Sequence, residues 1–405
     1  MKGVSDVDIA IVGAGLAGGA LAAALSGRGL RLALIESRPL TAPELPLQRE
    51  LDAFDSRVSA LNPESVSLLQ RLEAWQSVEQ YRCCAYHHMT VWDAEGTGQI
   101  EFDAADVDHS ALGYIVENRA VISGLIARLQ DAGDLRVVAP GKLAAVAIED
   151  DTVNLQLEDG DTLRARLLVA ADGALSSVRS LLQFRTREWD YGHRALVATV
   201  ETGRPHGNTA WQRFLPSGPL AFLPLPGENG RHFCSIVWSL RDSLADEVLA
   251  LDDTAFCDRL EEAFEQRLGR VVGASPRAAF PLRQRHAVDY IRPRVALVGD
   301  AAHTIHPLAG QGINLGFKDV SVLAEEVLAA HGRGVDPGDL AVLRRYQRRR
   351  KGENLLMMGA MDTFKRLFEQ ESLPLRWLRS AGMNAVHRAG PLKQEIMRRA
   401  MGLGV

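Results

Sequence analysis

The sequence predicts an α/β fold in which a parallel, doubly wound sheet carries an inserted antiparallel layer and a helical C-terminus. A strand, a glycine-rich turn, a helix and a second strand follow one another between residues 7 and 36, as in a parallel βαβ unit. Strand-like segments without intervening helices occupy residues 195–238, which indicates a second sheet. Residues 340–400 have the apolar spacing of helices.

Length and charge narrow the class of protein. The chain has 405 residues, more than one compact core usually supports, so we expect two closely joined domains. Its net charge of −5 argues against a nucleic-acid partner. Residues 344–405 nevertheless hold 14 Lys and Arg against 5 Asp and Glu. Such a basic end favours an anionic membrane surface or an acidic partner; the plainer alternative is the solvated face of terminal helices.

The chain has four cysteines, which are Cys83, Cys84, Cys234 and Cys257. Because no CxxC pair occurs, we expect neither a zinc site nor a disulfide framework, but reduced thiols in a cytoplasmic protein. The apolar N-terminus contains Asp6, Asp8 and several glycines, which argues against a signal peptide. No run of 18 apolar residues occurs, so the sequence predicts no membrane-spanning helix.

The first motif is the glycine turn at residues 13–18, between a buried strand and an Ala/Leu-rich helix. Gly13 permits the tight turn, Gly15 lets backbone N–H groups approach a pyrophosphate, and Gly18 lets helix and strand pack closely. The helix N-terminus adds a partial positive charge for phosphates. We therefore expect this turn, including Ala14 and Leu16, to bind a dinucleotide; a turn without a ligand is the alternative.

Glu36 ends the second strand, at residues 31–35. A carboxylate at this place can accept hydrogen bonds from both ribose hydroxyls, and it disfavours a 2′-phosphate. The nucleotide predicted for this site is therefore FAD or NAD rather than NADP.

Asp172 and Gly173 form the second motif, after an apolar strand at residues 163–169 and before Ser176 and Arg179. An acid followed by glycine at a strand end is usually only a turn. This motif becomes an indication of cofactor binding only because a similar arrangement occurs further along the chain.

That third motif begins with another short buried strand at residues 295–299, which is followed by Asp300. Asp300 can accept hydrogen bonds from the ribityl hydroxyls of a flavin. Pro307 fixes the next turn, while Gly310 and Gly312 offer backbone donors. After Ile313 a helix is expected from Asn314 to about Ala330. Its N-terminus would lie at a ring carbonyl and favour the negative charge of reduced flavin at N1 and C2=O.

His303 and His306 lie within this third motif. Histidine titrates near neutral pH, so either residue could relay a proton from a phenol. Hydrogen bonds that merely hold the loop are the alternative, and no carboxylate triad completes a metal site with the two histidines.

Other segments predict the remaining architecture. Residues 39–56 read as a long loop and residues 59–80 as helical, and strands are expected near 86–92, 98–102, 135–148, 153–157 and 162–170. Aromatic residues and a proline in the strand-rich block suit either an apolar substrate pocket or an ordinary sheet core; they are Trp211, Phe214, Phe222, Pro224, Phe233 and Trp238.

Together the three motifs resemble those of flavoprotein aromatic hydroxylases of the para-hydroxybenzoate hydroxylase type. Further segments resemble the flavin hydroxylases of aerobic ubiquinone biosynthesis, namely residues 55–61, 89–93, 113–121, 211–226, 235–240, 280–287, 299–320, 344–350 and 400–403. The resemblance covers essentially the whole chain, the basic end included. It is strongest to the polyprenylphenol and demethoxyubiquinol hydroxylases, and it does not separate these two.

The resemblance implies a fold with three parts. A discontinuous, Rossmann-like FAD-binding domain would comprise residues 1–80, 105–185 and 283–345. Residues 81–104 and 186–282 would form the inserted antiparallel-sheet substrate domain, and residues 346–405 the C-terminal helical region.

The resemblance also implies an activity. The protein would be an FAD-dependent monooxygenase that uses NAD(P)H and O₂ to hydroxylate a polyprenylated phenol or quinol in ubiquinone biosynthesis, through a C4a-hydroperoxyflavin. NAD(P)H would bind transiently, because the chain has no second nucleotide fold. Arg57 and Arg119 would lie near the FAD, and no metal would be needed. Two alternatives stay open: a hydroxylase of a soluble small phenol, and a flavin-bearing subunit that organises a quinone-synthesis complex.

A substrate with a polyprenyl chain is dissolved in the bilayer. We therefore expect the basic C-terminal region to make peripheral contact with the inner face of the membrane, or with a ubiquinone-biosynthesis complex.

Overall fold

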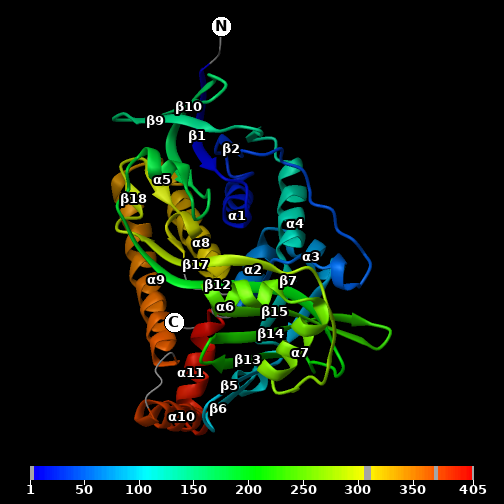
Figure 1. Ribbon diagram of the computed structural model, residues 1–405. Coiled ribbons are helices and arrows are strands. Elements are labelled where there is room, and N and C mark those ends of the chain that lie inside the picture. Colours follow the sequence, from blue (N-terminus) through cyan, green and yellow to red (C-terminus); the bar gives the residue numbers. More distant parts are fainter. Residues whose placement is uncertain (1–3, 305–311, 369–372, 404–405) are drawn as a thin grey trace.

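The computed structural model describes residues 4–304, 312–368 and 373–403 of the chain (Figure 1). A mostly parallel sheet forms one part of the molecule and a large antiparallel sheet the other. The helix that follows residue 340 runs down one side of both parts, and the last helices lie beside the antiparallel sheet (Figure 1).

The first sheet has the strand order β18-β19-β11-β1-β2-β8. Its strands are β1 (Val4–Val12), β2 (Leu32–Ile35), β8 (Leu135–Val138), β11 (Thr162–Ala170), β18 (Ile291–Arg292) and β19 (Val295–Leu297). All neighbours except β18 and β19 pair in parallel. Helix α1 (Leu16–Leu25) packs beside this sheet between α4 (Asn118–Gln130) and α8 (Gly312–His331). Because the strands are parallel, the residues that follow them meet at one edge of the sheet.

The antiparallel sheet has the order β20-β17-β12-β15-β14-β13-β5-β6, and β16 also pairs with β12. Its strands are β5 (His88–Asp93), β6 (Gln99–Asp103), β12 (Thr186–Thr202), β13 (Thr209–Leu215), β14 (Gly218–Glu228), β15 (Arg231–Arg241), β16 (Val271–Ala274), β17 (Ala278–Ala287) and β20 (His303–Thr304). Helices α6 (Asp242–Ala250) and α7 (Asp253–Ala263) share an apolar core with it, which includes Trp238, Phe222 and Phe256.

Three short strands, β3 (Val58–Leu61), β4 (Cys83–Tyr86) and β7 (Gly113–Glu117), form a small sheet of their own. The helical character expected of residues 59–80 is confirmed for most of that range and wrong for its first residues. Those residues pair with β7, and two helices come next, α2 (Pro63–Arg71) and α3 (Trp75–Tyr81). Asn62 caps α2 by accepting a hydrogen bond from the Ser65 N–H, and Glu73 lies between the helices with a φ of 59°.

The strand expected at 135–148 is also wrong as one element, because Pro140 separates β8 from β9 (Leu143–Ile148). Strand β8 belongs to the parallel order, whereas β9 pairs antiparallel with β10 (Val153–Leu157), which in turn pairs with β11. The loop expected at residues 39–56 is confirmed, apart from a short 3-10 turn at Leu51–Ala53. The boundaries of the three predicted domains stay a prediction.

The helical C-terminus is confirmed, with α9 (Leu340–Phe368), α10 (Leu373–Arg388) and α11 (Gly390–Ala400). A buried ion pair fixes α10 to β5, because Arg379 donates to both carboxylate oxygens of Asp93 at 2.6 and 2.7 Å. Helix α11 packs on the 3-10 turn Ala104–Val107. In the part of the chain that the structure describes, no helix combines the length and apolarity needed to span a bilayer.

Candidate cofactor and substrate site

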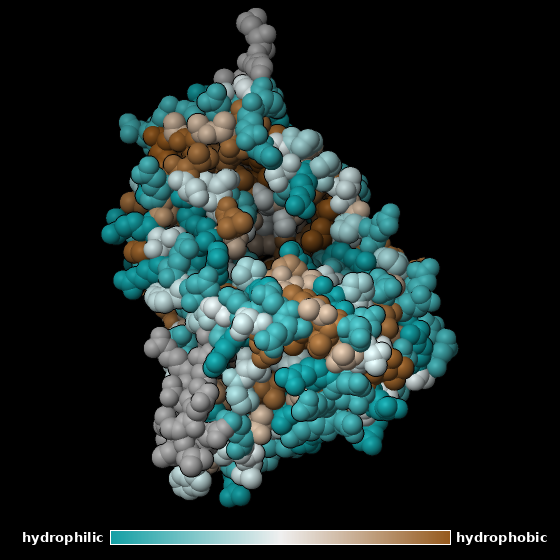
Figure 2. All heavy atoms as spheres, viewed as in Figure 1, coloured by the Kyte–Doolittle hydropathy of each residue, from teal (hydrophilic) through white to brown (hydrophobic). Residues whose placement is uncertain are grey.

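The predicted motifs lie at one edge of the parallel sheet. The glycine turn follows β1, Glu36 follows β2, Asp172 follows β11, and Asp300 comes soon after β19. These four strands are neighbours, so segments far apart in the sequence meet where ligands of doubly wound sheets usually bind. The visible face of the molecule is hollowed between this part and the antiparallel sheet (Figure 2).

The glycine turn has the geometry that its spacing predicts. Gly13 has a φ of 98°, and a Cβ there would lie 2.5 Å from the Ala171 carbonyl oxygen. A Cβ on Gly18 would lie 1.8 Å from the Gly13 carbonyl oxygen, so the helix could not approach the strand with any larger residue. Gly15 is exposed, and a Cβ there would meet nothing within 4 Å. The turn is therefore closed toward the sheet and open where a phosphate group would approach.

Glu36 lies beside this turn. One of its carboxylate oxygens accepts a hydrogen bond from the Ala14 N–H at 2.8 Å, and the other accepts from the Ser37 hydroxyl and the Arg38 N–H. Partial burial opposes ionisation, but these hydrogen bonds lower the pKa of Glu36 below its ordinary value. The residue is thus an anion with acceptor sites left for two hydroxyls.

Asp172 holds the start of helix α5 (Ser177–Leu181). Its Oδ2 atom accepts hydrogen bonds from the Ser177 N–H and hydroxyl and from the Val178 N–H. Its Oδ1 atom is buried without a partner among the described residues. Gly173 follows with a φ of 80°.

The loop around Asp300 is fixed from two sides. Arg179, from the second motif, donates to the Ala301 carbonyl at 2.9 Å, and Asp319 of α8 accepts from the Gly299 N–H at 3.1 Å. The Asp300 side chain is solvent-accessible, and no other described residue is its hydrogen-bond partner. Its deep location desolvates the carboxyl and raises its pKa, against the opposing effect of His303. An accessible acceptor held in this way suits the hydroxyls of a bound cofactor.

A buried polar network lies directly behind that loop. Asp319 and Arg350 are both fully buried and form an ion pair at 2.7 Å. Asn354 donates to Asp319 at 3.2 Å and to the Tyr290 hydroxyl at 3.3 Å. Burial raises the pKa of Asp319, but the charges and hydrogen bonds of His303 and Arg350 outweigh it and leave the pKa lowered.

His303 belongs to this network. It is 2% exposed, and its Nε2 lies 2.5 Å from Asp319 Oδ2. His306, Pro307 and Gly310, which were also predicted as site residues, lie outside the described residues. Sequence reasoning missed Asp319, Arg350 and Asn354. The signal available for Asp319 was an acid placed among the apolar residues of its helix, between Phe317 and Val320.

Helix α8 begins at Gly312 and Ile313, two residues before the expected start at Asn314. Asn314 ties this helix to the small sheet. Its amide nitrogen donates to the Ala60 carbonyl at 2.8 Å, and its oxygen accepts from the Asn62 N–H and the Ser65 hydroxyl. These bonds hold the N-terminus of α8 against the small sheet and the start of α2.

The two predicted arginines have different surroundings. Arg57 is exposed, and its guanidinium lies 5.1 Å from the centre of the Phe280 ring. Arg119 is half-buried and bonded to Glu117, with its Nε 2.9 Å from the carboxylate. Arg82 also pairs with Glu117, at 2.9 Å. Arg119 is thus part of a buried ion-pair cluster, a role that its sequence position did not reveal.

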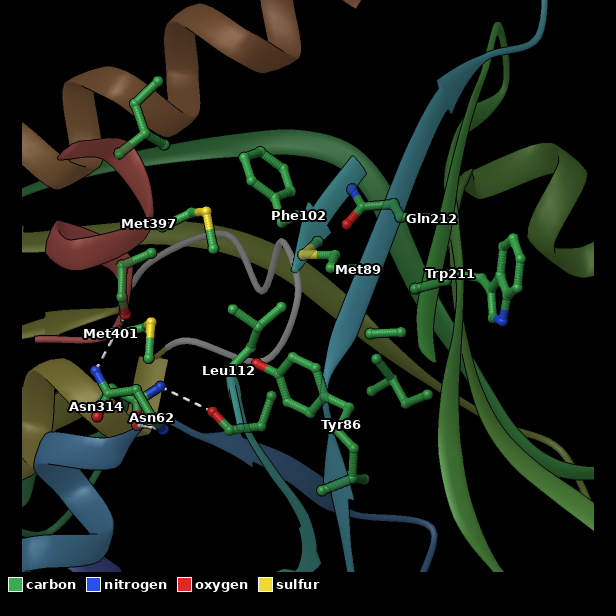
Figure 3. A pocket seen from close by; sticks show the side chains of 17 residues that line it. Asn62, Tyr86, Met89, Phe102, Leu112, Trp211, Gln212, Asn314, Met397 and Met401 are labelled. Atoms are coloured by element: carbon green, nitrogen blue, oxygen red, sulfur yellow. Dashed lines mark hydrogen bonds between the residues drawn. The ribbon is translucent and has the colours of Figure 1, made fainter. Parts of the chain in front are cut away.

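A pocket of about 750 Å³, counted to its open mouth, lies between α8, the small sheet, the antiparallel sheet and α11 (Figure 3). Asn62 and Asn314 face the pocket at one end, where Met401 of α11 lies beside them, and Met397 lies one turn further along α11 (Figure 3). Most of the remaining lining is apolar; it includes Tyr86, Met89, Phe102, Leu112, Ile115 and Leu223. Gln212, which is 6% exposed, supplies one amide. The size and lining suit an apolar ligand with few polar groups.

The predicted aromatic residues divide between pocket and core. Trp211 lines the pocket. Phe222 and Trp238 belong to the core under α6 and α7, Phe233 contacts Phe54, and Phe214 stacks on Phe368. The core alternative therefore holds for most of them.

A glycine turn after the first strand, an acid after the second, a third motif leading into a helix N-terminus, and an apolar pocket beside it form the arrangement expected of an FAD-dependent monooxygenase. The fold agrees with solved structures of such enzymes. The Pseudomonas aeruginosa FAD-dependent monooxygenase PqsL superposes with a TM-score of 0.77 at 23% identity, over 94% of this chain and 100% of that one. The p-nitrophenol 4-monooxygenase PnpA of Pseudomonas putida superposes with a TM-score of 0.77 at 19% identity, over 99% of both chains.

Sequence comparison defines the family. Residues 6–355 match the FAD binding domain family. The chain is 38% identical to the 3-demethoxyubiquinol 3-hydroxylase of Escherichia coli, over 98% of each chain, and 34% identical to the human mitochondrial ubiquinone biosynthesis monooxygenase COQ6, over 96% of this chain and 91% of that one. A ubiquinone hydroxylase of Rhodospirillum rubrum is 38% identical, over 98% of this chain and 89% of that one. The chain belongs to this family of FAD-dependent ubiquinone-biosynthesis hydroxylases, in which NAD(P)H is the typical electron donor.

Proposed function

We propose that this protein hydroxylates the aromatic ring of a polyprenylated phenol or quinol in ubiquinone biosynthesis. The pocket carries the proposal, because it is predominantly apolar and joins the N-terminus of α8 to the surface of α11. A ring placed near Asn62 and Asn314 would lie at the flavin end, with room behind it for hydrocarbon. The names of the relatives support the same substrate class.

The geometry of the described residues supports the following assignment of the FAD contacts. The backbone of Gly13, Ala14, Gly15, Leu16 and Gly18 would receive the pyrophosphate. Glu36 would bind the ribose. Asp300 would bind the ribityl chain, supported by the loop contacts of Arg179 and Asp319.

The flavin ring would lie at the start of α8, where Gly312, Ile313 and Asn314 present the helix N-terminus. Arg57, Arg119, Asp172, Gly173, Pro307 and Gly310 complete the proposed set. When bound, the flavin supplies the reducing equivalents and activates O₂.

The protein's own part is orientation, exclusion of water and electrostatics. The N-terminus of α8 favours negative charge on the ring system it faces. The apolar lining keeps water from the reacting ring. Gln212, which is nearly buried and lines the side of the pocket away from Asn62 and Asn314, offers its amide to a polar group of the substrate (Figure 3). We propose no catalytic base; His303 is bonded to Asp319, and a proton relay through it stays a prediction.

The test is to supply the purified, FAD-loaded protein with NAD(P)H, O₂ and phenols that share one ring but do or do not carry a prenyl chain. We expect ring hydroxylation of the prenylated phenol. Turnover of only unprenylated phenols would instead support a hydroxylase of soluble substrates. Hydrogen peroxide as the sole product with every phenol would overturn the proposal. The quinone precursor that accumulates in a deletion strain would identify the ring position.

A strain with Asp300→Ala separates catalysis from an organising role. We expect this variant to lose FAD and to fail to restore quinone synthesis. Restored synthesis without bound FAD would favour the organising-subunit alternative.

We further propose that the C-terminal helices bind an anionic membrane surface. Leu356 of α9 and Trp377 of α10 are 69% and 74% exposed, in a region rich in Lys and Arg. Apolar side chains among basic ones are the usual composition of such a surface.

We expect the protein to co-float with vesicles that contain anionic lipid and not with neutral ones. A Leu356→Ser/Trp377→Ser variant should no longer co-float with anionic vesicles. The control Leu175→Ser, at an exposed site outside these helices, should still do so. Equal flotation of both variants would contradict the proposal, and capture of partner enzymes without flotation would favour a complex instead.

A further inference from the structure

We propose that one apolar stripe on α11, formed by Leu392, Ile396 and Ala400, is the path along which the hydrocarbon chain of the substrate enters and leaves the pocket. This inference rests on the proposed function and adds to it the element that contacts the chain. The three residues are spaced by four, so they lie on one face of the helix.

The stripe is both pocket wall and molecular surface. Ile396 and Ala400 line the pocket, and yet Ile396 is 41% exposed and Ala400 is also exposed. Leu392, one turn further from the pocket, is 52% exposed. The pocket therefore opens beside α11, and the rim on this side is apolar.

The other faces of α11 are fixed. Met397 and Met401 are 3% and 2% exposed and pack with Val107 and Leu112. The Lys393 ammonium lies 2.7 Å from the Asp106 carboxylate. At the C-terminal end, the Asn62 side chain donates to the Ala400 carbonyl at 3.2 Å (Figure 3). The helix is thus held in place by the packing of its buried face and by polar contacts at its edge.

A hydrocarbon chain explains this arrangement better than a small phenol does. An aromatic ring alone would fit within the pocket and would need no apolar rim outside it. A chain attached to the ring must leave the pocket somewhere, and burying its methylene groups against apolar side chains favours binding. Arg399 is the sequence neighbour of Ala400 and lies three residues from Ile396, so a basic residue borders the apolar stripe.

The experiment measures binding rather than turnover. Phenols with one common ring and chains of zero, one, two and three isoprene units are titrated into the oxidised, FAD-loaded protein, and the change in flavin absorbance is followed. For the unaltered protein we expect the Kd to fall at least tenfold from no chain to the longer chains, equivalent to about 1.4 kcal/mol.

Two variants place a charge in the stripe, Ile396→Glu and Leu392→Glu. Each should abolish the tightening that the chain provides. Leu392→Glu, which lies outside the pocket, should also leave the Kd of the chain-free phenol within about twofold. Leu392 does not line the pocket, so Leu392→Glu keeps the test valid if Ile396→Glu disturbs the fold. The matched control is Arg398→Glu, which places the same charge on the opposite side of α11 and should change neither Kd.

The outcomes separate the two proposals. If both stripe variants retain the dependence on chain length, the inference is wrong even if hydroxylation proceeds. If chain-bearing phenols bind as expected and no phenol is hydroxylated, the proposed function fails while the assignment of the stripe stands. If the control loses the dependence as well, a general charge effect on α11 replaces the proposed path.

Discussion

The two ends of the site are built in different ways. The cofactor end consists of backbone turns and buried charges, in which Gly13 and Gly18 leave no room for a Cβ and Asp319 is bonded on several sides. The substrate end is lined by apolar side chains, among them Met397 and Met401. Backbone turns and ion pairs allow few alternatives, whereas methionine side chains adapt to different shapes. We therefore expect substitutions at the cofactor end to reduce stability and FAD binding together. Substitutions at the substrate end should change the affinity for substrate in small steps.

The largest effect is expected from Gly18→Ala. The added Cβ would lie 1.8 Å from the Gly13 carbonyl oxygen, which requires the helix to move from the strand. We expect a loss of about 3 kcal/mol or more in the free energy of unfolding, and no bound FAD. Gly15→Ala is the matched control, because a Cβ there meets nothing within 4 Å. It should fold normally and weaken FAD binding only, as thermal unfolding and flavin content would show. Similar unfolding of both variants would refute the assignment of separate roles.

Asp319→Asn should come next. It removes the buried carboxylate partner of Arg350 and leaves only the half-exposed Glu353, so we expect a loss of about 3 kcal/mol, the lower end for a broken buried pair. It also weakens the support of the Gly299 N–H, so FAD affinity should fall together with stability. Glu326→Gln is the control on the same two helices, because it removes the partner of Arg345 and Arg349 near the surface. We expect that change to cost about 1 kcal/mol or less and to leave the Kd of FAD unchanged. Urea unfolding and titration of apoprotein with FAD would distinguish them.

The same contrast explains what the sequence predicted. The glycine turn and Glu36 depend on contacts within about 30 residues, so their spacing sufficed to predict the geometry. The network behind Asp300 joins α8 to α9 and to β20. No local sequence pattern predicts that Asp319 contacts Arg350 and His303. Arg119 was expected near the cofactor from resemblance, yet its partner Glu117 becomes apparent only in the fold.

The small sheet shows the same limit on secondary structure. Residues 59–61 continue the helical spacing of residues 62–80, but their pairing with β7, far along the chain, determines their conformation. Asn62-Pro63 was a local helix-start signal that should have shifted the predicted start of that helix. The pocket lay beyond local patterns altogether, since α11 and β5 contribute to it from opposite ends of the chain.

At the substrate end we expect a smaller, graded response. Gln212→Leu removes the amide proposed to bond a polar group of the substrate, and one such hydrogen bond is worth about 0.5–1.5 kcal/mol. The KM for the phenol should rise by up to about tenfold, with stability nearly unchanged. Met89→Leu is a volume-conserving change in the same lining and should alter KM by less than about twofold. Steady-state kinetics would test both, and a collapse of FAD binding in either variant would contradict the distinction between the two ends.

The smallest effect concerns acid stability at the cofactor end. Burial, together with the nearby charge of His303, lowers the pKa of His286 to about 4, so this histidine stays neutral in the folded protein. As the pH falls through the unfolded value near 6.5, the unfolded chain takes up a proton that the folded one does not, and stability is lost until about pH 4. Between pH 7 and pH 6 this linkage contributes about 0.7 kcal/mol. His286→Gln, which retains a group able to bond the Tyr290 hydroxyl, should lose that increment in urea unfolding at the two pH values. An unchanged difference would show that the acid sensitivity arises from another group.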